Sequence, residues 1–506
     1  MTVPLDLAVW HHRFAEVAEE IGAALGASAL SPNIKERRDY SAAVFDAAGD
    51  LVAQAAHIPV HLGAAPLGVQ AVLKKVRLSP GDHAIANDPF EGGTHLPDIS
   101  IVTPVYLPGE DSPRFYVATR AHHADVGGET PGSMPLSTHI DQEGVRISPT
   151  LLTDDVRAEL LGRARGAAER AADLGAQIAA NEVGAARLRA LARDPACVDR
   201  MAALRRYAAS RMRAVLSTIP SGVHRFVDVL DDDGAGTRDV RIAVAIERRG
   251  DEVLVDFTGS APQVPGCLNA TEAITVSAVL YVLRCLAPAD LPTNAGCMDP
   301  IRVVLPERSV VNAAAPAAVA GGNVETSQRI VDVLLGALAG ALPDRIPAAS
   351  QGTMNNVAFG GADWAYYETI GGGAGAAPGA AGLSGVHTHM TNTRNTPIEA
   401  LSREMPVDVV AYRLRRGSGG AGRFPGGEGI VRRYRFRRAA TLTILSERRV
   451  HAPWGLAGGG PGATGMNLLR RAGGPQEELP GKCVLEVGVG DEVEIQTPGG
   501  GGFGAG

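Results

Sequence analysis

Two short segments, residues 87–98 and 120–128, concentrate side chains that could bind a metal ion or transfer a proton. They contain three of the chain's 13 histidines among nearby carboxylates: Glu91, His95, Asp98, His122, His123 and Asp125. Imidazole and carboxylate groups together form a ligand set that suits Zn, Mn or Fe. The clustering therefore predicts a divalent metal site, with ordinary hydrogen-bonded turns as the alternative interpretation.

Spacing indicates which of these side chains could share one ion. His95 and Asp98 lie three residues apart, so both could face an ion from a single loop. If the second segment is a strand, His123 and Asp125 share one face and His122 points to the other. We therefore expect His123 to bind the ion, with His122 behind it or against the substrate.

Three earlier residues, Asp39, His57 and His61, could join this site, although each taken singly reads as a surface or turn residue. Later segments carry strings of neutral hydrogen-bonding side chains next to glycine, at residues 321–328, 351–356 and 386–397. Such strings suit a polar pocket for amide-like groups, or a tightly turned core. Asn323 or Thr326 could instead be the N-cap of a following helix.

Several common motifs are missing or broken in this sequence. Residues 417–422 match GxGxxG, but Pro425 and paired glycines follow where the helix of a dinucleotide-binding fold would begin. The sequence has no GxxxxGK[ST] loop and no GxSxG nucleophile elbow. Any ATP-dependent step would therefore need a nucleotide site that none of these motifs provides.

The composition is that of a folded globular protein. The chain has 506 residues, of which 45% are hydrophobic and 20% charged, and 48 basic against 55 acidic side chains give a net charge of −7. That charge predicts neither nucleic-acid nor anionic-membrane binding. The five cysteines show no CxxC spacing, the longest apolar run (333–342) is too short to span a bilayer, and the first 25 residues include acidic side chains. We expect a cytoplasmic protein.

The hydrophobic patterns predict a mixed α+β, multi-domain fold. An N-terminal region of sheet plus helix (1–150) holds the expected metal site and opens with an amphipathic helix over 10–25. A central helical segment (151–220) and a mixed α/β region (221–346), with helices at 272–286 and 325–342, follow. The Gly-rich region 347–506 is expected to be mostly β, with residues 371–385 as a mobile loop.

Seven segments resemble the hydantoinase B/oxoprolinase family. They are NDPFEGGTHLPDIS, RAHHADVGG, IPVHLG, AGGNVETSQR, QGTMNN, HMTNTRNTPIEALSREMPV and TPGGGGFG. The resemblance runs from about residue 36 to 504 and implies a metal in this subunit. The family's metal-site segments fall on Asp39, on His95 and Asp98, and on the 122–125 run. His139 departs from the acidic residue that many relatives would carry.

The resemblance also implies a hetero-oligomer with a hydantoinase A-type subunit that carries Mg-ATP in an actin-like site. That partner would phosphorylate the carbonyl oxygen of a cyclic amide such as a hydantoin, 5-oxoproline or another lactam, and water activated by the metal would then open the ring. Glu91, His122 or Asp125 could be the general base. Neutral side chains would orient the ring: Asn355, Asn356, Thr393 and Asn395. The alternatives are a subunit of an acetone or acetophenone carboxylase, a standalone metallohydrolase and a non-catalytic scaffold.

Overall fold

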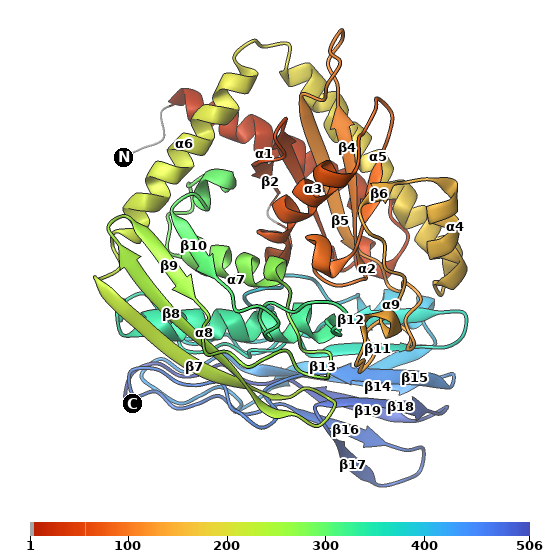
Figure 1. Cartoon of the computed structure of the whole chain (residues 1–506). Helices are drawn as coiled ribbons and strands as arrows, with labels where there is room; N and C mark the ends of the chain where they lie inside the picture. Colours follow the sequence, from red (N-terminus) through yellow and green to blue (C-terminus); the bar gives the residue numbers. More distant parts are fainter. Residues whose placement is uncertain (1–4, 56) are drawn as a thin grey trace.

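The computed structural model describes residues 5–55 and 57–506 (Figure 1). The chain begins with a mixed layer of sheet and helices, continues through a long helical arm into a second sheet, and ends in two further sheets (Figure 1). This arrangement confirms the expected α+β class.

The first sheet has six strands in the order β2-β1-β5-β4-β3-β6. Their bounds are β1 (Tyr40–Asp46), β2 (Leu51–Gln54), β3 (Ala84–Ala86), β4 (Asp98–Val105), β5 (Phe115–His122) and β6 (Thr150–Leu151). Helices α1 (Leu5–Ser28) and α5 (Ala167–Leu191) pack on one face, and α3 (Ala64–Lys75) packs on the other. The apolar stripe expected for the first helix is buried in α1: Trp10, Phe14, Val17, Ile21 and Leu25.

A helical arm connects this layer to the second sheet. It consists of α4 (Asp154–Arg163), α5 and α6 (Cys197–Leu216). The second sheet has the order β10-β9-β8-β7 and comprises β7 (Gly222–Asp232), β8 (Arg238–Arg249), β9 (Glu252–Asp256) and β10 (Ile301–Val304). Helix α8 (Ser327–Ala339) packs against β7, β8 and α7 (Glu272–Cys285). The largest apolar cluster contains side chains from Ile58 to Leu445, so sequence regions far apart share one core.

The C-terminal region is a sandwich of two sheets. One has the order β12-β11-β15-β18 and comprises β11 (Asn356–Gly360), β12 (Ala365–Glu368), β15 (Ala440–Leu445) and β18 (Lys482–Val487). The other has the order β13-β14-β19-β16-β17 and comprises β13 (Val407–Arg415), β14 (Gly429–Phe436), β16 (Met466–Arg470), β17 (Gln476–Leu479) and β19 (Glu492–Gln496). Helix α9 (Ile398–Glu404) caps the shared core.

Short helical turns link these layers. They are α2 (Pro32–Lys35), η1 (Pro59–His61), η2 (Pro89–Glu91), η3 (Ile140–Gln142), η4 (Ala295–Cys297) and the π-helical η5 (Gly322–Thr326). The helix expected at 325–342 therefore begins with a π turn, and no side-chain cap bond is made at Thr326. None of the described helices is long and apolar enough to cross a membrane.

The glycine-rich segments form a packed bundle of backbones. Gly427 N–H donates to Ala374 O, Gly500 N–H donates to Gly427 O, and Ala376 N–H donates to Gly501 O, each at 2.9 Å. A side chain on Gly373 would overlap the Gly427 carbonyl oxygen, so neighbouring segments approach at distances that only glycine permits. The mobile-loop expectation for 371–385 is therefore wrong for residues 371–377, which are buried or half-buried.

Candidate metal centre

The register of the first sheet brings the best metal-ligand candidates together. Asp98, the first residue of β4, pairs across the antiparallel ladder with His122, the last residue of β5. The His122 N–H in turn donates to the backbone oxygen of Asp39 at 3.0 Å, just before β1. His95 reaches the same end of the sheet from the preceding turn, where its carbonyl oxygen accepts the Asp98 N–H at 3.1 Å.

Three side chains form a compact, buried group that could hold an ion: His95, Asp98 and His122. His95 Nε2 lies 3.2 Å from Asp98 Oδ1, and His122 Nδ1 lies 3.3 Å from the same oxygen. The two ring nitrogens are 3.2 Å apart. Each of the three side chains is at most 3% exposed, so the group is shielded from bulk water.

The donor set and its spacing fit a divalent transition metal. Ligands held about 2.1 Å from a tetrahedral ion lie roughly 3.4 Å from one another, close to the spacing seen here. Two imidazoles and one carboxylate leave coordination positions open, as in catalytic rather than structural sites. Asp98, His95 and His122 would hold the ion.

Neighbouring groups hold the second oxygen of Asp98 in place. Asp98 Oδ2 accepts a hydrogen bond from Thr94 Oγ1 at 2.6 Å and lies 3.1 Å from His61 Nε2. His61 Nδ1 lies 2.9 Å from Ser41 Oγ, which fixes the ring on both sides. His61 thus stands behind the carboxylate, as the partners of metal ligands often do.

The electrostatics favour an ionised Asp98 and a neutral His122, but they favour protonation of His95, which would have to lose its proton to bind an ion. Burial opposes ionisation of Asp98, but His95 and His61 outweigh it and hold the pKa of that carboxyl well below its usual range. Burial lowers the pKa of His122, which favours the neutral ring that a metal requires. Burial also acts on His95, but the Asp98 carboxylate raises the pKa of that ring.

A small cavity of about 20 Å³ adjoins the group, enough space for a water molecule or an ion. Its lining includes Asp39, His61, Asp98, His122, Asn323 and Tyr367. The Tyr367 ring stacks on His122 with centroids 4.6 Å apart, and the Arg37 guanidinium lies 4.9 Å from the Tyr367 ring centroid. Asp39 is thus at the cavity but outside the three-residue group, and its Oδ2 lies 3.5 Å from Arg37 Nη2.

The structure differs from the expectation that His123 rather than His122 faces the ion. Strand β5 ends at His122, and this residue, paired with Asp98, points to the cavity. His123 points into the layer of α5, where its Nε2 lies 2.9 Å from Gln177 Oε1. Burial lowers the pKa of His123 to about 4, so it is a neutral core histidine. Because the strand ends at His122, the strand alternation expected for His123 and Asp125 does not apply, and His122 is the residue that joins the candidate ligands.

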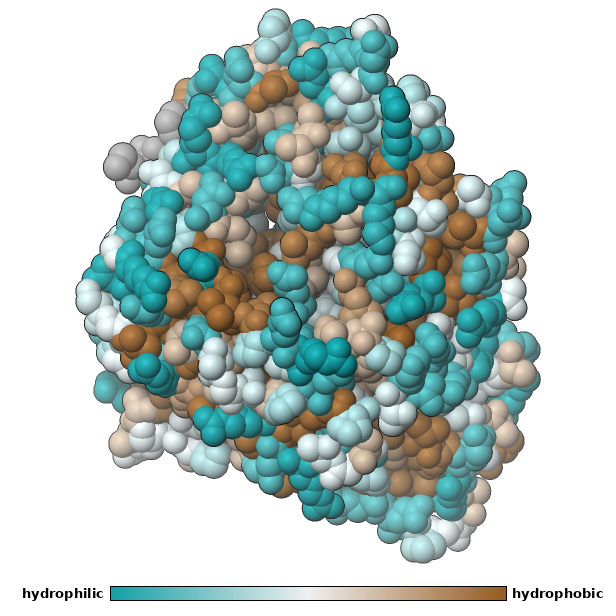
Figure 2. Space-filling model, in the orientation of Figure 1, coloured by the Kyte–Doolittle hydropathy of each residue, from teal (hydrophilic) through white to brown (hydrophobic). Residues whose placement is uncertain are grey.

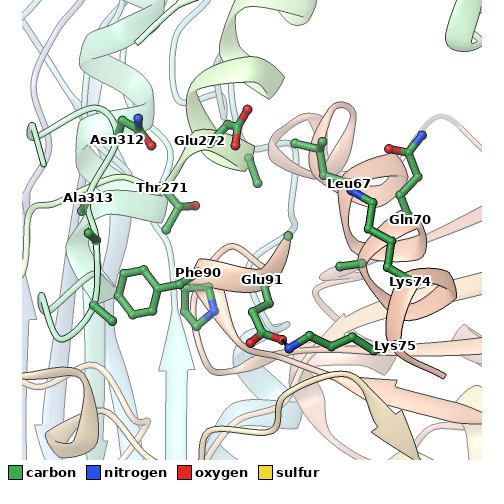
Figure 3. Close-up of a pocket in the computed structure, with 16 residues that line it drawn as sticks. Leu67, Gln70, Lys74, Lys75, Phe90, Glu91, Thr271, Glu272, Asn312 and Ala313 are labelled. Atoms are coloured by element: carbon green, nitrogen blue, oxygen red, sulfur yellow. Dashed lines mark hydrogen bonds and ion pairs between the residues drawn. The ribbon is translucent and has the colours of Figure 1, made fainter. Parts of the chain in front are cut away.

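The two other expected proton-transfer residues have structural partners away from this group. Asp125 Oδ2 accepts hydrogen bonds from Arg165 Nη1 at 3.0 Å and Gly132 N at 3.1 Å, and its Oδ1 accepts from two further backbone N–H groups. Glu91 points toward Lys75, with Oε2 2.5 Å from Nζ, in an open pocket of about 460 Å³ (Figure 3). Neither side chain belongs to the candidate metal-binding group.

The expected substrate-binding side chains are engaged in internal hydrogen bonds. Asn355 donates to Gln351 Oε1 at 2.8 Å and accepts from Arg449 at 2.8 Å. Asn356 donates to Glu325 Oε1 at 2.6 Å and accepts from Tyr367 Oη at 2.7 Å. Asn356 therefore anchors the tyrosine that stacks on His122.

The other two, Thr393 and Asn395, lie in the segment after β12. Thr393 Oγ1 lies 2.8 Å from Thr369 Oγ1, which lines the cavity. Asn395 Nδ2 donates to Glu368 Oε2 at 2.8 Å, and Tyr412 Oη donates to Asn395 Oδ1 at 3.0 Å. Thr393 thus contacts Thr369 but does not itself line the cavity. Asn395 donates to the buried carboxylate of Glu368.

Sequence reasoning missed Tyr367 and the approach of Asn323 to His95. Asn323 Nδ2 lies 3.0 Å from His95 Nε2, across 228 positions of sequence. The Gly-Gly-Asn run was a usable signal, because paired glycines permit close backbone approach. Nothing in the sequence around Tyr367 indicates that it stacks on a histidine.

The sequence model of the hydantoinase B/oxoprolinase family matches residues 3–506. The chain belongs to this family. The candidate metal-binding group described above thus lies in a hydantoinase B-type fold, and the similarity extends through both C-terminal sheets.

Particular relatives share this chain's sequence or fold. The 5-oxoprolinase 1 of Arabidopsis thaliana is 40% identical over 99% of this chain, which covers 42% of that protein. The structure of the ATP-dependent caprolactamase from Pseudomonas jessenii superimposes with a TM-score of 0.92 at 27% identity, over 100% of this chain and 92% of the other. An acetone carboxylase structure has the same fold, with a TM-score of 0.86 at 18% identity, over 98% of this chain and 75% of the other.

The chain spans about two fifths of the length of the first curated relatives that it matches.

Proposed function

We propose that this chain is the ring-opening half of an ATP-dependent cyclic amide hydrolase. The observation that carries the proposal is the buried group of His95, Asp98 and His122 beside a small cavity. The names of the relatives, 5-oxoprolinase and caprolactamase, support a lactam as the substrate class.

A partner would supply the ATP chemistry. An unstrained amide is a poor electrophile, and phosphorylation of its carbonyl oxygen converts that oxygen into a leaving group. The sequence carries no P-loop, and the 5-oxoprolinase relative is more than twice as long as this chain. We propose that a hydantoinase A-type subunit or domain phosphorylates the substrate, forming a hetero-oligomer where it is a separate chain.

The surface supports an association of this kind. Figure 2 shows several apolar patches, separated by hydrophilic residues, on the face seen in Figure 1. Extended apolar patches on a protein surface mark interaction sites more often than scattered single residues do.

The ion would be Zn, Mn or Fe, held by His95, Asp98 and His122, with Asp39 as a further ligand from the same cavity. When bound, such an ion polarises a carbonyl or lowers the pKa of water. The chain's own residues keep bulk water out, hold Asp98 ionised and hold the His122 ring against Tyr367. Glu91 and Asp125 are paired with Lys75 and Arg165, so the proposal gives them no proton transfer.

Reconstitution tests the proposal. The chain is co-purified with the product of the neighbouring gene, and ATP hydrolysis and ring opening are measured over hydantoins, 5-oxoproline and larger lactams. The proposal predicts ring opening only with both chains and ATP. Ring opening by this chain without ATP would identify a standalone metallohydrolase, and incorporation of labelled bicarbonate into a ketone without lactam turnover would identify a carboxylase.

A further inference from the structure

The π-helical turn η5 presents an amide side chain to the metal-binding group. Turns of this kind are rare and frequently occur at functional sites. A side chain at Gly322 would overlap the carbonyl oxygen of Asn269, so this glycine lets the turn pack closely against the neighbouring segment. The result is that Asn323, which is 4% exposed, lines the cavity beside Asp98 and His122.

The two ends of the Asn323 amide are in unequal surroundings. Its Nδ2 lies 3.0 Å from His95 Nε2, whereas its Oδ1 is buried and has no hydrogen-bond partner among the described residues. A buried acceptor without a hydrogen bond costs free energy, so a ligand or ion that binds this oxygen would stabilise the fold. The oxygen and nitrogen of an amide exchange places by rotation of the side chain and are assigned from the surrounding network.

A cation in the group would reverse the preferred orientation of this amide. A positive ion bound to His95 Nε2 repels the N–H dipoles of Nδ2 and attracts the carbonyl oxygen. Rotation would place Oδ1 where Nδ2 lies now, 3.0 Å from His95 Nε2. That spacing is similar to the 3.2 and 3.3 Å that separate the other candidate ligand atoms.

We propose that Asn323 Oδ1 is a ligand of the divalent ion held by His95, Asp98 and His122, a role that rests on the metal-dependent function proposed above. The ion would then link η5, the turn that precedes α8, to the end of the N-terminal sheet, although these two parts are far apart in the sequence. A carbonyl oxygen is a ligand type that suits Mn²⁺.

Affinity measurements on the full-length, tag-free chain test this proposal. The protein is stripped with a chelator, and its affinities for Mn²⁺ and Zn²⁺ are measured by competition with a fluorescent chelator. We expect Asn323→Leu to weaken Mn²⁺ binding at least about tenfold, and Zn²⁺ binding by less. Asn323→Asp, which keeps an oxygen at this position, should bind Mn²⁺ as tightly as the wild type or more tightly.

Asn181 offers a matched control. It is also fully buried with an unpaired Oδ1, and its Nδ2 donates to Ile101 O and Thr103 Oγ1 at 3.0 Å, further along β4. Asn181→Leu should leave both metal affinities unchanged. Any loss of affinity common to both leucine variants would reflect general damage and would count against a specific role for Asn323.

The visible absorption of the Co²⁺-loaded chain reports on the ligand set directly. The d–d bands should shift in Asn323→Leu and, differently, in Asn323→Asp, which preserves the shape of the side chain if the leucine variant fails to fold. Unchanged affinities and bands in a folded Asn323 variant would overturn the role of Asn323 alone. A wild-type chain that binds neither ion would overturn the metal centre, and with it this proposal.

Discussion

His122 pairs with Asp98 across the β4–β5 ladder, and its Nδ1 lies 3.3 Å from Asp98 Oδ1. Directly paired residues of an antiparallel sheet project to the same face. The backbone register therefore sets the relation between these two groups before any ion binds. A site built on paired strands is held more rigidly than one built on loops.

This register predicts opposite outcomes for two adjacent histidines. His122→Ala should lose the bound metal, because it removes one of the proposed donors, and elemental analysis of tag-free protein would show this. His123→Ala should retain the metal and lower the free energy of unfolding by about 1–3 kcal/mol, because it leaves Gln177 without its partner. Metal loss in the His123 variant alone would contradict the assignment.

The two carboxylates outside the group should differ in their effect on stability. Asp125→Ala removes the acceptor for Arg165 and three backbone N–H groups, and should cost about 3–5 kcal/mol in urea unfolding. Glu91→Gln breaks a partly exposed pair with Lys75 and should cost less than about 1 kcal/mol. Both variants should keep the metal if they fold. Metal loss in a folded Glu91→Gln variant would show that Glu91 contributes to metal binding.

Stability should fall as the pH rises through the titration of Glu143. Burial raises the pKa of this carboxyl from 4.5 to about 7, although Ser137 and two backbone N–H groups oppose the shift, as does the charge of His95. Between about pH 4.5 and pH 7 the folded state then holds more protons than the unfolded state, so the free energy of unfolding decreases with pH.

Glu143→Gln removes this titration and should flatten the decrease by up to about 1.4 kcal/mol per pH unit. Urea unfolding at pH 5, 6 and 7, with a chelator present so that metal binding makes no contribution, would measure the difference. Equal slopes in the two proteins would show that Glu143 does not titrate in this window.

The glycine bundle should be sensitive to single methyl groups. Gly373→Ala places a Cβ against the Gly427 carbonyl oxygen and should destabilise the fold by about 1–3 kcal/mol or more. Gly488→Ala is the matched control, because the nearest atom to its Cβ would be 3.7 Å away. Thermal unfolding of both variants checks this, and equal midpoints would mean that the bundle is looser than described.

Hydrophobic periodicity predicted where helices and strands occur better than it predicted which of them pack or pair with one another. The stripe from Trp10 to Leu25 identified α1, because one buried helix face needs only a local pattern. The strands β4 and β5 were also predictable, but their pairing was not, and pairing decides that His122 meets Asp98. The expectation of His123 rather than His122 beside Asp98 came from this missing information.

Glycine-rich composition was misleading for a different reason. Glycine favours flexibility in isolation, yet residues 371–377 pack against Gly427 and against 498–501, and only their three-dimensional contacts reveal it. The approach of Asn323 to His95 has the same origin. The paired glycines before Asn323 indicate that a close approach is possible there, but local spacing does not identify the segment that is approached.

In the proposed function, this chain opens a cyclic amide that a partner has activated with ATP. The most direct measurement is the ratio of rings opened to ATP hydrolysed by the reconstituted complex, for the wild type and for His122→Ala. We expect coupled turnover in the wild type, and in the variant a loss of ring opening while the partner still hydrolyses ATP. Ring opening at the wild-type rate by His122→Ala, or without ATP by the wild type, would contradict it.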